Sequence, residues 1–455
     1  MPGDLYYGDN LDVMRRHVAT ETVDLVYLDP PFNSDRTYNL VSKDTQATER
    51  AFVDSWEWDE NAETAFRELI ARVSPSAEIP KQLREIMLSL KVFLDERRDM
   101  LAYLSMMAIR MVEMRRALRK TGSIYVHCDP TASHYLKIIL DAIFGPENFR
   151  REIIWRSGWV SGFKTKTANW VRNHDTILYY LRDRRDSFTF NKELAYKPHA
   201  DGYKRRGGGA NPKGVALDDV WDEVALYSPW IKSFSTEKLG YMTQKPLTLL
   251  DRLISVSSNA GDLVLDPFCG CGTTIEAAER IGRNWIGIDI AIRAINAIKD
   301  RLGEKFTPRV WTEHGEPANV EQAARLADTN AYDFQWWAVR LMGGHSPRGE
   351  KKKGGNRGVD GELTLIDRSG SVRRGIVSVK GGRALTPDLV KALAETVRQQ
   401  QGDFGVLVTM HAPTQRMRDI ARDYGTTPWA FEDTGRQAHR IRIITIPELM
   451  AGETL

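Results

Sequence analysis

A carboxylate, two prolines and an aromatic ring stand together at Asp29-Pro30-Pro31-Phe32, directly after the apolar run Val23 to Leu28. Consecutive prolines fix two backbone angles and remove two amide donors, so that nearby carbonyl oxygens face outward as acceptors. The Asp29 carboxylate and such a carbonyl can both accept hydrogen bonds from an exocyclic amine, and the Phe32 ring offers a face to a flat base. The alternative is an ordinary turn that ends a strand.

A second candidate site follows the apolar run Leu263 to Asp266, where a glycine-rich turn opens a predicted helix from Thr274 to Ile281. Glycines allow a backbone to approach a ligand where a side chain would collide. Asp289 ends the next apolar run, 17 positions beyond Gly272. This spacing resembles the dinucleotide fingerprint, in which an acid about 20 residues beyond the glycines binds ribose hydroxyls. The alternative is tight packing of a strand against a helix.

Taken together, these motifs resemble the DNA amino-methyltransferases, with DPPF as the catalytic motif and DPFxGxGTT as the cofactor motif. The catalytic motif comes first, which is similar to the permuted beta class of that family. The resemblance implies S-adenosylmethionine as the cofactor and double-stranded DNA as the partner. It implies the catalytic residues Asp29, Pro30, Pro31 and Phe32, and the cofactor-binding residues Asp9, Asn10, Lys245, Asp266, Phe268, Gly270, Gly272, Thr273 and Asp289.

Within that family, an aspartate at the first position of the catalytic motif usually accompanies adenine, so the resemblance favours adenine over cytosine as the target. A base inside a duplex cannot reach such a pocket and must be flipped out. Three alternatives stay open: a cytosine-amine methyltransferase, a bifunctional restriction enzyme with an active C-terminal nuclease, and a DNA-binding protein without catalysis. The leading expectation is a site-specific adenine methyltransferase in restriction-modification.

Positive charge gathers between the two motifs. The segment from Arg150 to Lys213 holds 15 Lys or Arg and 6 Asp or Glu, with tryptophans among them. Cations interleaved with aromatic rings suit a surface that follows phosphates and touches bases. The alternative is a solvated face with scattered core aromatics. We therefore predict a target-recognition region at 151–240, with DNA-binding candidates Arg156, Lys164, Lys166, Arg205 and Arg206.

Strands that alternate with helices predict an α/β fold with a doubly wound sheet. The resemblance implies that this sheet is circularly permuted and Rossmann-like, and is formed by residues 1–150 and 241–305. A helical insertion is expected from about 60 to 120, in which the methionines between Met100 and Leu118 pack in a core. We also expect Thr176 to Leu181 to form a hairpin with Phe188 to Phe190. A linker at 306–330 would lead to a smaller α/β domain at 331–455.

The C-terminal segment is similar to the Mrr-type restriction-endonuclease fold in the lines Gly358 to Gly361 and Val377 to Gly381. The resemblance implies a nuclease-like site at Asp360, Glu362, Ser378 and Lys380, with Mg²⁺ held at Asp360. Serine stands at position 378 where the family has an acid or glutamine, and hard cations prefer carboxylate oxygens. Glu362 is the candidate substitute. An active nuclease and an inactive DNA-binding module remain equal alternatives.

Composition adds limits. The net charge is only +3, and the three cysteines are too few and wrongly spaced for a zinc site or a disulfide framework. No segment is long and apolar enough to span a membrane, and the first residues have no leader pattern. We expect a cytoplasmic protein of a bacterium or archaeon. Dimers are common in the resembling class, which makes a homodimer the expected assembly to test.

Overall fold

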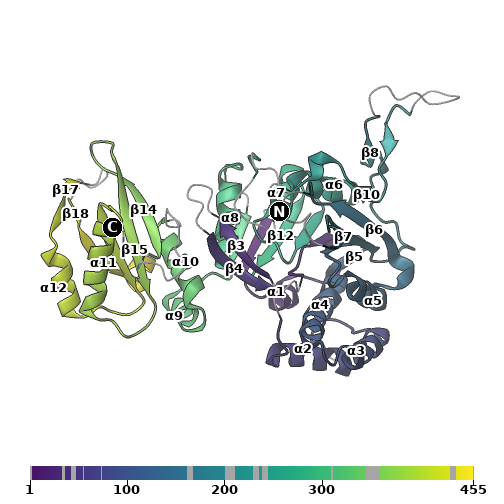
Figure 1. Ribbon diagram of the computed structural model, residues 1–455, viewed down its shortest axis with the longest axis horizontal. Helices are drawn as coiled ribbons and strands as arrows, with labels where there is room; N and C mark the ends of the chain where they lie inside the picture. The colour runs from purple at the N-terminus through teal and green to yellow at the C-terminus, as the bar shows by residue number, and fades with distance from the viewer. Residues whose placement is uncertain are drawn as a thin grey trace. The chain divides into compact units, whose positions relative to one another are not determined.

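The computed structural model describes residues 3–32, 36–41, 48–54, 56–72, 74–160, 168–199, 211–228, 235–237, 244–308, 311–344, 359–430 and 437–453. The chain divides into two compact units. The first consists of Met1–Leu40, Arg50–Ile290 and Ala297–His314, and the second of Val41–Glu49, Ala291–Asn296 and Gly315–Leu455. Each unit has its own sheet (Figure 1).

A twisted sheet forms the centre of the first unit, and nine of its strands lie in the described part of the chain. Strand β7 is antiparallel to its two neighbours, and the other paired strands run parallel. In spatial order the strands are β10 (Val220–Trp221), β6 (Phe149–Arg156), β7 (His174–Leu181), β5 (Leu118–Cys128), β2 (Val23–Leu28), β11 (Leu263–Asp266), β12 (Asn284–Asp289), β1 (Gly3–Tyr7) and β13 (Trp311–His314).

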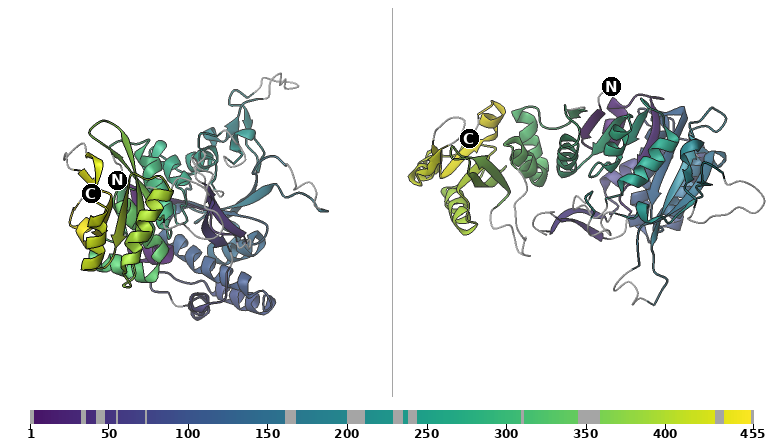
Figure 2. Two further views of the ribbon diagram at one scale, coloured as in Figure 1. Left: turned by 60° about the vertical axis from the view of Figure 1, so that its left-hand side comes forward. Right: turned by 90° about the horizontal axis from the view of Figure 1, so that it is seen from above.

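Helices cover both faces of this sheet, as the two turned views show (Figure 2). Side chains alternate along a strand, so Val26 and Val126 enter the core shared with α1 (Asn10–His17), α4 (Arg98–Ala117) and α5 (Ser133–Phe144). Tyr125 points to the other face, where its hydroxyl bonds Ser257 of α6 (Leu247–Ser257). Helix α7 (Thr273–Arg280) packs against α6. The predicted doubly wound fold is confirmed.

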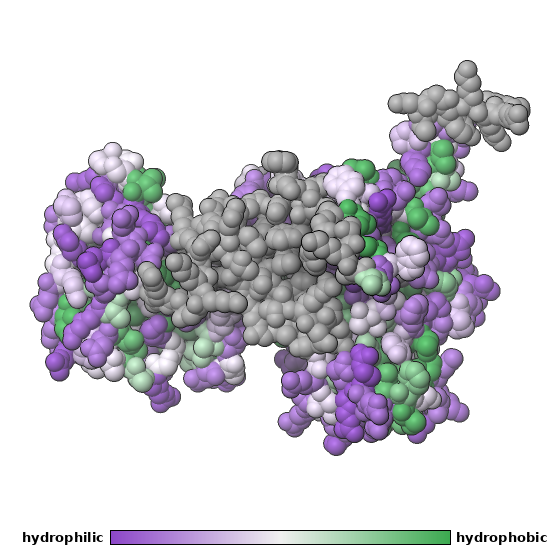
Figure 3. Space-filling view, viewed as in Figure 1, coloured by the Kyte–Doolittle hydropathy of each residue, from purple (hydrophilic) through white to green (hydrophobic). Residues whose placement is uncertain are grey.

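A helical insertion follows β4 (Thr48–Asp54) and consists of α2 (Glu60–Ala71), α3 (Lys81–Phe93) and α4. The methionines of α4 are buried, which confirms the prediction that they pack in a core. Hydrophobic residues gather on the surface where α3 and α5 lie, seen as green atoms at the lower right of Figure 3. The most exposed of them are Val92, Phe93 and Ile138.

The predicted hairpin between Thr176 to Leu181 and Phe188 to Phe190 is wrong. Residues 188–190 form no strand, and β7 pairs with β5 and β6 instead. The apolar side chains of β7 are buried on both faces, because a central position in the sheet satisfies such a run better than a two-stranded hairpin would.

Two boundaries also differ from the expectation. Strands β6 and β7 of the main sheet lie largely within the predicted recognition region, 151–240. Within the predicted linker, 306–330, the described residues include the edge strand β13 and the helix α9 (Val320–Thr329). The remaining short elements of the first part of the chain are β3 (Arg36–Val41), β4 (Thr48–Asp54), β8 (Tyr196–Lys197), β9 (Val215–Ala216) and α8 (Ile292–Gly303).

The second unit is a smaller α/β fold, as predicted. Its sheet has the order β14 (Gly361–Ile366), β15 (Val372–Lys380), β16 (Phe404–Thr409) and β19 (Ile441–Thr445), with only the first pair antiparallel among the described strands. Helices α11 (Pro387–Gln399) and α12 (Gln415–Asp423) pack on it. The other elements are α10 (Ala331–Leu341), β17 (Thr426–Ala430), β18 (Gln437–His439) and α13 (Ile446–Met450). Among the described residues, no helix has the length and apolar character of a membrane span.

Candidate functional site

Acidic side chains follow the carboxyl ends of five neighbouring strands of the first unit. These are Asp129 after β5, Asp29 after β2, Asp266 ending β11, Asp289 ending β12 and Asp9 after β1. Strands β2 and β11 are adjacent and parallel, with Val26 opposite Leu265. The two motifs that lie more than two hundred residues apart in the sequence therefore meet at one edge of the sheet, which is where ligands bind in this class of fold.

Asp29 is held by a lysine from a distant segment. The Lys245 ammonium donates to Asp29 Oδ2 at 2.5 Å, and both side chains are largely buried. Lys245 Nζ also lies 5.4 Å from the centre of the Phe32 ring. The other carboxylate oxygen, Asp29 Oδ1, is buried and has no hydrogen-bond partner among the described residues. A buried acceptor without a donor is costly, so Oδ1 is a strong acceptor for an entering N–H group.

Asp266 lies near Asp29 and is almost fully buried. Its Oδ1 accepts a hydrogen bond from the Phe268 amide at 3.1 Å. Burial raises the pKa of this carboxyl group to about 7, and the negative charges of Asp29 and Asp289 act in the same direction. Near neutral pH, both forms of Asp266 are therefore populated: the carboxylate, which only accepts hydrogen bonds, and the protonated acid, which can also donate one.

The glycine-rich turn after β11 has the shape of an open cradle. Gly270 and Gly272 both adopt positive φ, +50° and +76°. A Cβ at Gly270 would meet only the Phe268 carbonyl oxygen, at 4.0 Å, whereas a Cβ at Gly272 would collide with Ile298 at 2.6 Å. The Gly270 amide donates to Asp289 Oδ2 at 2.9 Å. Gly272 thus serves packing, and Gly270 keeps the backbone open beside the acid.

The segment after β1 completes the cofactor side of the site. Asp9 caps helix α1 by accepting from the amides of Leu11 and Asp12. Asn10 donates to the Pro267 carbonyl oxygen at 2.6 Å, and Arg110 donates to both Asp9 and Asn10. The predicted residues Asp9 and Asn10 are therefore tied to the DPF turn. Thr273 opens helix α7, and Arg301 donates to its hydroxyl at 3.1 Å.

Behind Phe32 lies a polar chain that the sequence reasoning missed. His127 in β5 is fully buried and its ring stacks on that of Phe32, with 6.0 Å between centroids and 23° between planes. The Tyr27 hydroxyl lies 3.1 Å from His127 Nδ1, and Asp175 Oδ2 lies 3.3 Å from Nε2. Arg172 binds both Asp175 and Asp129. The usable signal in the sequence was that His127 and Asp129 stand at the end of a predicted strand.

Of the five DNA-binding candidates, Arg156 lies in the described part of the chain. Arg156 ends β6 at the same edge of the sheet as Asp29, and its guanidinium lies 5.7 Å from the centre of the Tyr227 ring. Lys164, Lys166, Arg205 and Arg206 lie outside the described residues. Nearby, Trp170 is 96% exposed and Trp159 is 49% exposed. Aromatic surface of this kind beside an active edge is available to a base.

The nuclease-like residues of the second unit do not form one site: Asp360 contacts Ser378 and Lys380, whereas Glu362 is bound elsewhere. Asp360 accepts from the Val379 amide at 2.7 Å and the Ser378 hydroxyl at 3.2 Å, and Lys380 lies 3.6 Å from its Oδ2. Glu362 is instead bound by Arg374, which donates to both carboxylate oxygens at 2.6 and 2.9 Å. In the described part of the chain, no three potential ligands gather as a metal site.

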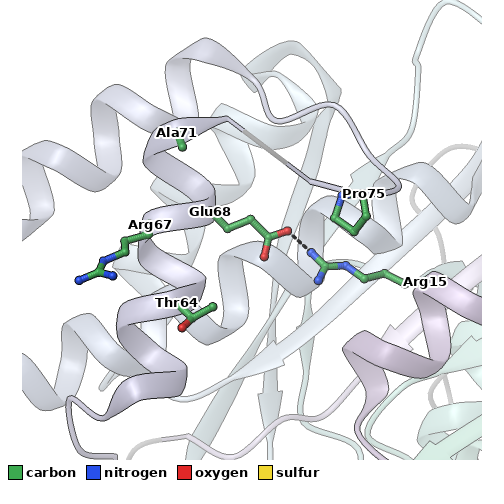
Figure 4. Close-up of a pocket in the computed structure, with 6 residues that line it drawn as sticks. All are labelled: Arg15, Thr64, Arg67, Glu68, Ala71 and Pro75. Carbon is green, nitrogen blue, oxygen red and sulfur yellow. Dashed lines mark hydrogen bonds and ion pairs between the residues drawn. The ribbon is translucent and has the colours of Figure 1, made fainter.

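A surface pocket in the first unit is lined by α1, α2 and the turn after α2 (Figure 4). Arg15 points into it and is bound by Glu68, and its Nε lies 3.4 Å from the fully buried Glu113. Arg15 contacts two carboxylates, and the other arginine of the lining, Arg67, pairs with Glu63, so both arginines of this pocket already have carboxylate partners. Its lining shares no residue with the site at the carboxyl ends of the strands.

The residues of that edge fit S-adenosylmethionine. The open backbone at Gly270 leaves room for a ligand, and Asp289 ends the strand beside it, as an acid that binds ribose hydroxyls would. The unpartnered Oδ1 of Asp29 lies on the adjoining strand end. One side of the edge thus suits the cofactor, and the other suits an amine.

Comparison with protein families gives two matches. Residues 23–300 match a family described as DNA methylase. Residues 342–451 match a family described as NACHT-associated inactive Restriction Endonuclease 1. The first match covers most of the first unit, including the DPPF and DPFxGxGTT motifs, and the second covers the sheet of the second unit.

Several individual proteins are also similar to this chain. Type II methyltransferase M.BamHI of Bacillus amyloliquefaciens is 28% identical over 316 residues, which are 67% of this chain and 57% of that protein. DNA adenine methyltransferase YhdJ of Escherichia coli is 25% identical, over 63% of this chain and 78% of that protein. The structure of the M1.HpyAVI–SAM complex is 19% identical with a TM-score of 0.37, and covers 66% of this chain and 98% of that one. The chain thus spans little more than half the length of M.BamHI.

Proposed function

Since the chain belongs to the DNA methylase family, we propose that it transfers a methyl group from S-adenosylmethionine to the exocyclic amine of adenine at a specific site in double-stranded DNA. The observation that carries the proposal is the buried, unpartnered Asp29 Oδ1 beside the Phe32 ring. An acceptor and an aromatic face are the two features that a flat base with an amine needs. Restriction-modification is the setting that this activity suits.

The catalytic roles follow from the weakness of the amine as a nucleophile, because its lone pair is delocalised into the ring. Asp29 Oδ1 would accept one amine hydrogen, and the Pro30 carbonyl oxygen would accept the other. Both bonds strengthen as positive charge develops on the nitrogen, so they stabilise the transition state more than the ground state. Pro31 keeps this turn rigid, and Phe32 would hold the ring.

The cofactor would lie on the other side of the same edge, where it supplies an electrophilic methyl group. Asp289 would bind its ribose, the open turn at Gly270 and Gly272 would pass beside it, and Phe268 and Thr273 would line the same cradle. Asp9, Asn10 and Asp266 would shape the remaining wall. Alignment of amine and methyl is a positional effect that can supply several kcal/mol of the barrier.

Adenine is the target that we favour. The aspartate at the first position of the catalytic motif and the match to an adenine methyltransferase both support it. The alternative is the cytosine amine, which would use the same acceptor and the same ring. Genomic DNA from a methylation-free host that expresses the wild type would carry N6-methyladenine in one sequence context. N4-methylcytosine in its place would support the alternative.

For the second unit we propose a DNA-binding role without cleavage. The description of the matching family as inactive supports this, and so does the bond between Glu362 and Arg374. A carboxylate neutralised by a bidentate arginine is a poor ligand for Mg²⁺, which would leave Asp360 as the one carboxylate beside Lys380. The alternative of an active nuclease predicts Mg²⁺-dependent cleavage that Lys380→Ala abolishes.

The experiment that tests the main proposal compares wild type with Asp29→Ala and Asp29→Asn. Radioactive methyl transfer from S-adenosylmethionine to duplex DNA should be lost in Asp29→Ala, while the affinity for S-adenosylmethionine stays close to that of wild type. If wild type transfers no methyl group to DNA of any sequence, the proposal is wrong. If Asp29→Ala keeps its activity, the assigned acceptor is wrong.

A further inference from the structure

Among the partners of the Phe32 ring is a histidine, His127, whose orientation is set by two hydrogen bonds. The Tyr27 hydroxyl lies 3.1 Å from His127 Nδ1, and Asp175 Oδ2 lies 3.3 Å from Nε2. His127 has no exposed side-chain surface. A ring with both nitrogens engaged cannot rotate without breaking a buried hydrogen bond, which is energetically costly. The plane of His127 is therefore fixed.

The protonation pattern of the chain follows from its partners. Burial raises the pKa of Tyr27, so its hydroxyl keeps its proton and can donate to Nδ1. Burial is the largest single effect and acts to raise the pKa of Asp175, but the interactions of Asp175 with His127, Lys245 and Arg172 together outweigh it, so the pKa lies below its ordinary value. Asp175 is thus an ionised, acceptor-only group, and Nε2 carries the hydrogen that it accepts.

His127 contacts aromatic rings on two sides. Phe32 stacks on it at 6.0 Å, and Trp155 of β6 meets it edge-on at 5.3 Å and 80°. Strand β5 carries His127 and strand β6 carries Trp155. The position of the Phe32 ring is therefore set by contacts with the rigid sheet as well as by its own turn. Such support is what a residue needs if it must hold a base within a fraction of an ångström.

The series of polar contacts that begins at Tyr27 and His127 continues through Asp175 to the surface segment before β7. Arg172 binds Asp175 and donates to Asp129 Oδ2 at 3.0 Å, and Asp129 is almost fully buried. Asn173 donates to the Gly158 carbonyl oxygen. The segment that presents the exposed Trp170 is therefore fastened to the strand end beside Phe32. The Phe32 ring and the segment of the exposed Trp170 are therefore both held by the same group of buried polar residues.

From these contacts we infer that His127 is a positioning residue for the target base: held by Tyr27 and Asp175, it fixes the Phe32 ring against which the extruded base stacks. The inference rests on the proposed function and deepens it. His127 itself touches no reacting atom. If the ring of Phe32 is less well placed, the extruded base is held less firmly, and a misplacement of about 1 Å can cost about 100-fold in rate.

The test uses His127→Asn and Tyr27→Phe in the full chain, with His314→Asn as the matched control. His314 also stacks on an aromatic ring, Tyr6 at 4.3 Å, and also bonds an aspartate, Asp4 at 2.8 Å, but it lies on the edge strand β13. Tyr27→Phe removes a single hydroxyl group, so it keeps the inference testable if His127→Asn does not fold.

We expect kcat for methyl transfer to fall about tenfold or more in His127→Asn and less in Tyr27→Phe, with unchanged affinity for S-adenosylmethionine. A mismatch opposite the target base makes extrusion easier. The mismatch should therefore raise kcat by a larger factor in these two variants than in wild type or His314→Asn.

Two results would overturn the inference. One is that both variants match His314→Asn in kcat and in the effect of the mismatch. The other is that cofactor affinity, thermal stability and rate fall together, because that is the behaviour of a structural strut. If wild type itself methylates no DNA, the proposed function fails and the role of His127 falls with it.

Discussion

Lys245 Nζ lies 2.5 Å from Asp29 Oδ2, across 216 residues of sequence, and leaves Asp29 Oδ1 buried without a partner. The lysine was expected among the cofactor-binding residues, yet its closest described contacts are with the catalytic motif. The ammonium occupies one carboxylate oxygen, so the other oxygen of Asp29 points away from the lysine. The pair therefore presents a single acceptor in a fixed direction.

Replacement of Lys245 by methionine should lower kcat by about 10- to 100-fold, because the Asp29 carboxylate loses the ammonium donor that holds it in place. Lys245→Arg retains the charge and should keep more of the activity. The affinity for S-adenosylmethionine, measured by calorimetry, separates two roles for the lysine. An unchanged affinity places its effect on Asp29, whereas a large loss of affinity with normal kcat would return Lys245 to the cofactor.

The buried acid Asp266 should make stability depend on pH. Its folded pKa of about 7 is above the unfolded value, so the native state binds the proton more tightly. Asp266 contributes fully to the free energy of unfolding below about pH 4, where the carboxyl group is protonated in both the folded and the unfolded state. This contribution is lost as the pH rises towards about 7. A shift of this size corresponds to the order of 4 kcal/mol.

Asp266→Asn should remove that dependence. Chemical denaturation of wild type and variant between pH 4 and 8 should show the variant gaining relative stability as pH rises. Asp186→Asn is the control, since Asp186 is exposed in the same unit. Parallel pH profiles for wild type and Asp266→Asn would show that the carboxyl group titrates normally.

The two glycines with nearly equal φ, Gly272 at +76° and Gly282 at +72°, allow the cost of a collision to be separated from the cost of backbone strain. Alanine at Gly282 meets no atom within 4 Å, so only the positive φ is penalised, at about 1 kcal/mol. Alanine at Gly272 also meets Ile298 at 2.6 Å. We expect Gly272→Ala to lose roughly 1–3 kcal/mol more in urea unfolding. Equal losses would show that Ile298 moves aside freely.

In the second unit, the pair Glu362 and Arg374 should behave as a buried structural ion pair. Arg374→Met leaves Glu362, which is 1% exposed, without its bidentate partner and should destabilise the unit by about 3–5 kcal/mol. Arg398→Met breaks a surface pair with Glu395 and should cost at most about 1 kcal/mol. Similar small losses in both variants would mean that Glu362 does not depend on Arg374, and the bond to Arg374 would then no longer argue against Glu362 as a metal ligand.

The sequence determined the elements with strong local signals. Leu247 to Val256 and Met100 to Leu118 have apolar residues at helical spacing and form α6 and α4 nearly as predicted. The runs ending at Leu28, Asp266 and Asp289 form β2, β11 and β12, because buried parallel strands are continuous apolar segments bounded by turn residues. The motifs also indicated the family, since their residue types follow from the chemistry they perform.

The tertiary structure decided which side chains meet. No local pattern brings Lys245 to Asp29, or His127, Asp175 and Arg172 to the back of Phe32, because these contacts depend on the order in which distant strands pair. For the same reason the apolar run of β7 joined the main sheet and not a hairpin. Glu362 lies two residues beyond Asp360, but Arg374 on the neighbouring strand binds it. Spacing sets the face of a residue, and only the fold sets its partner.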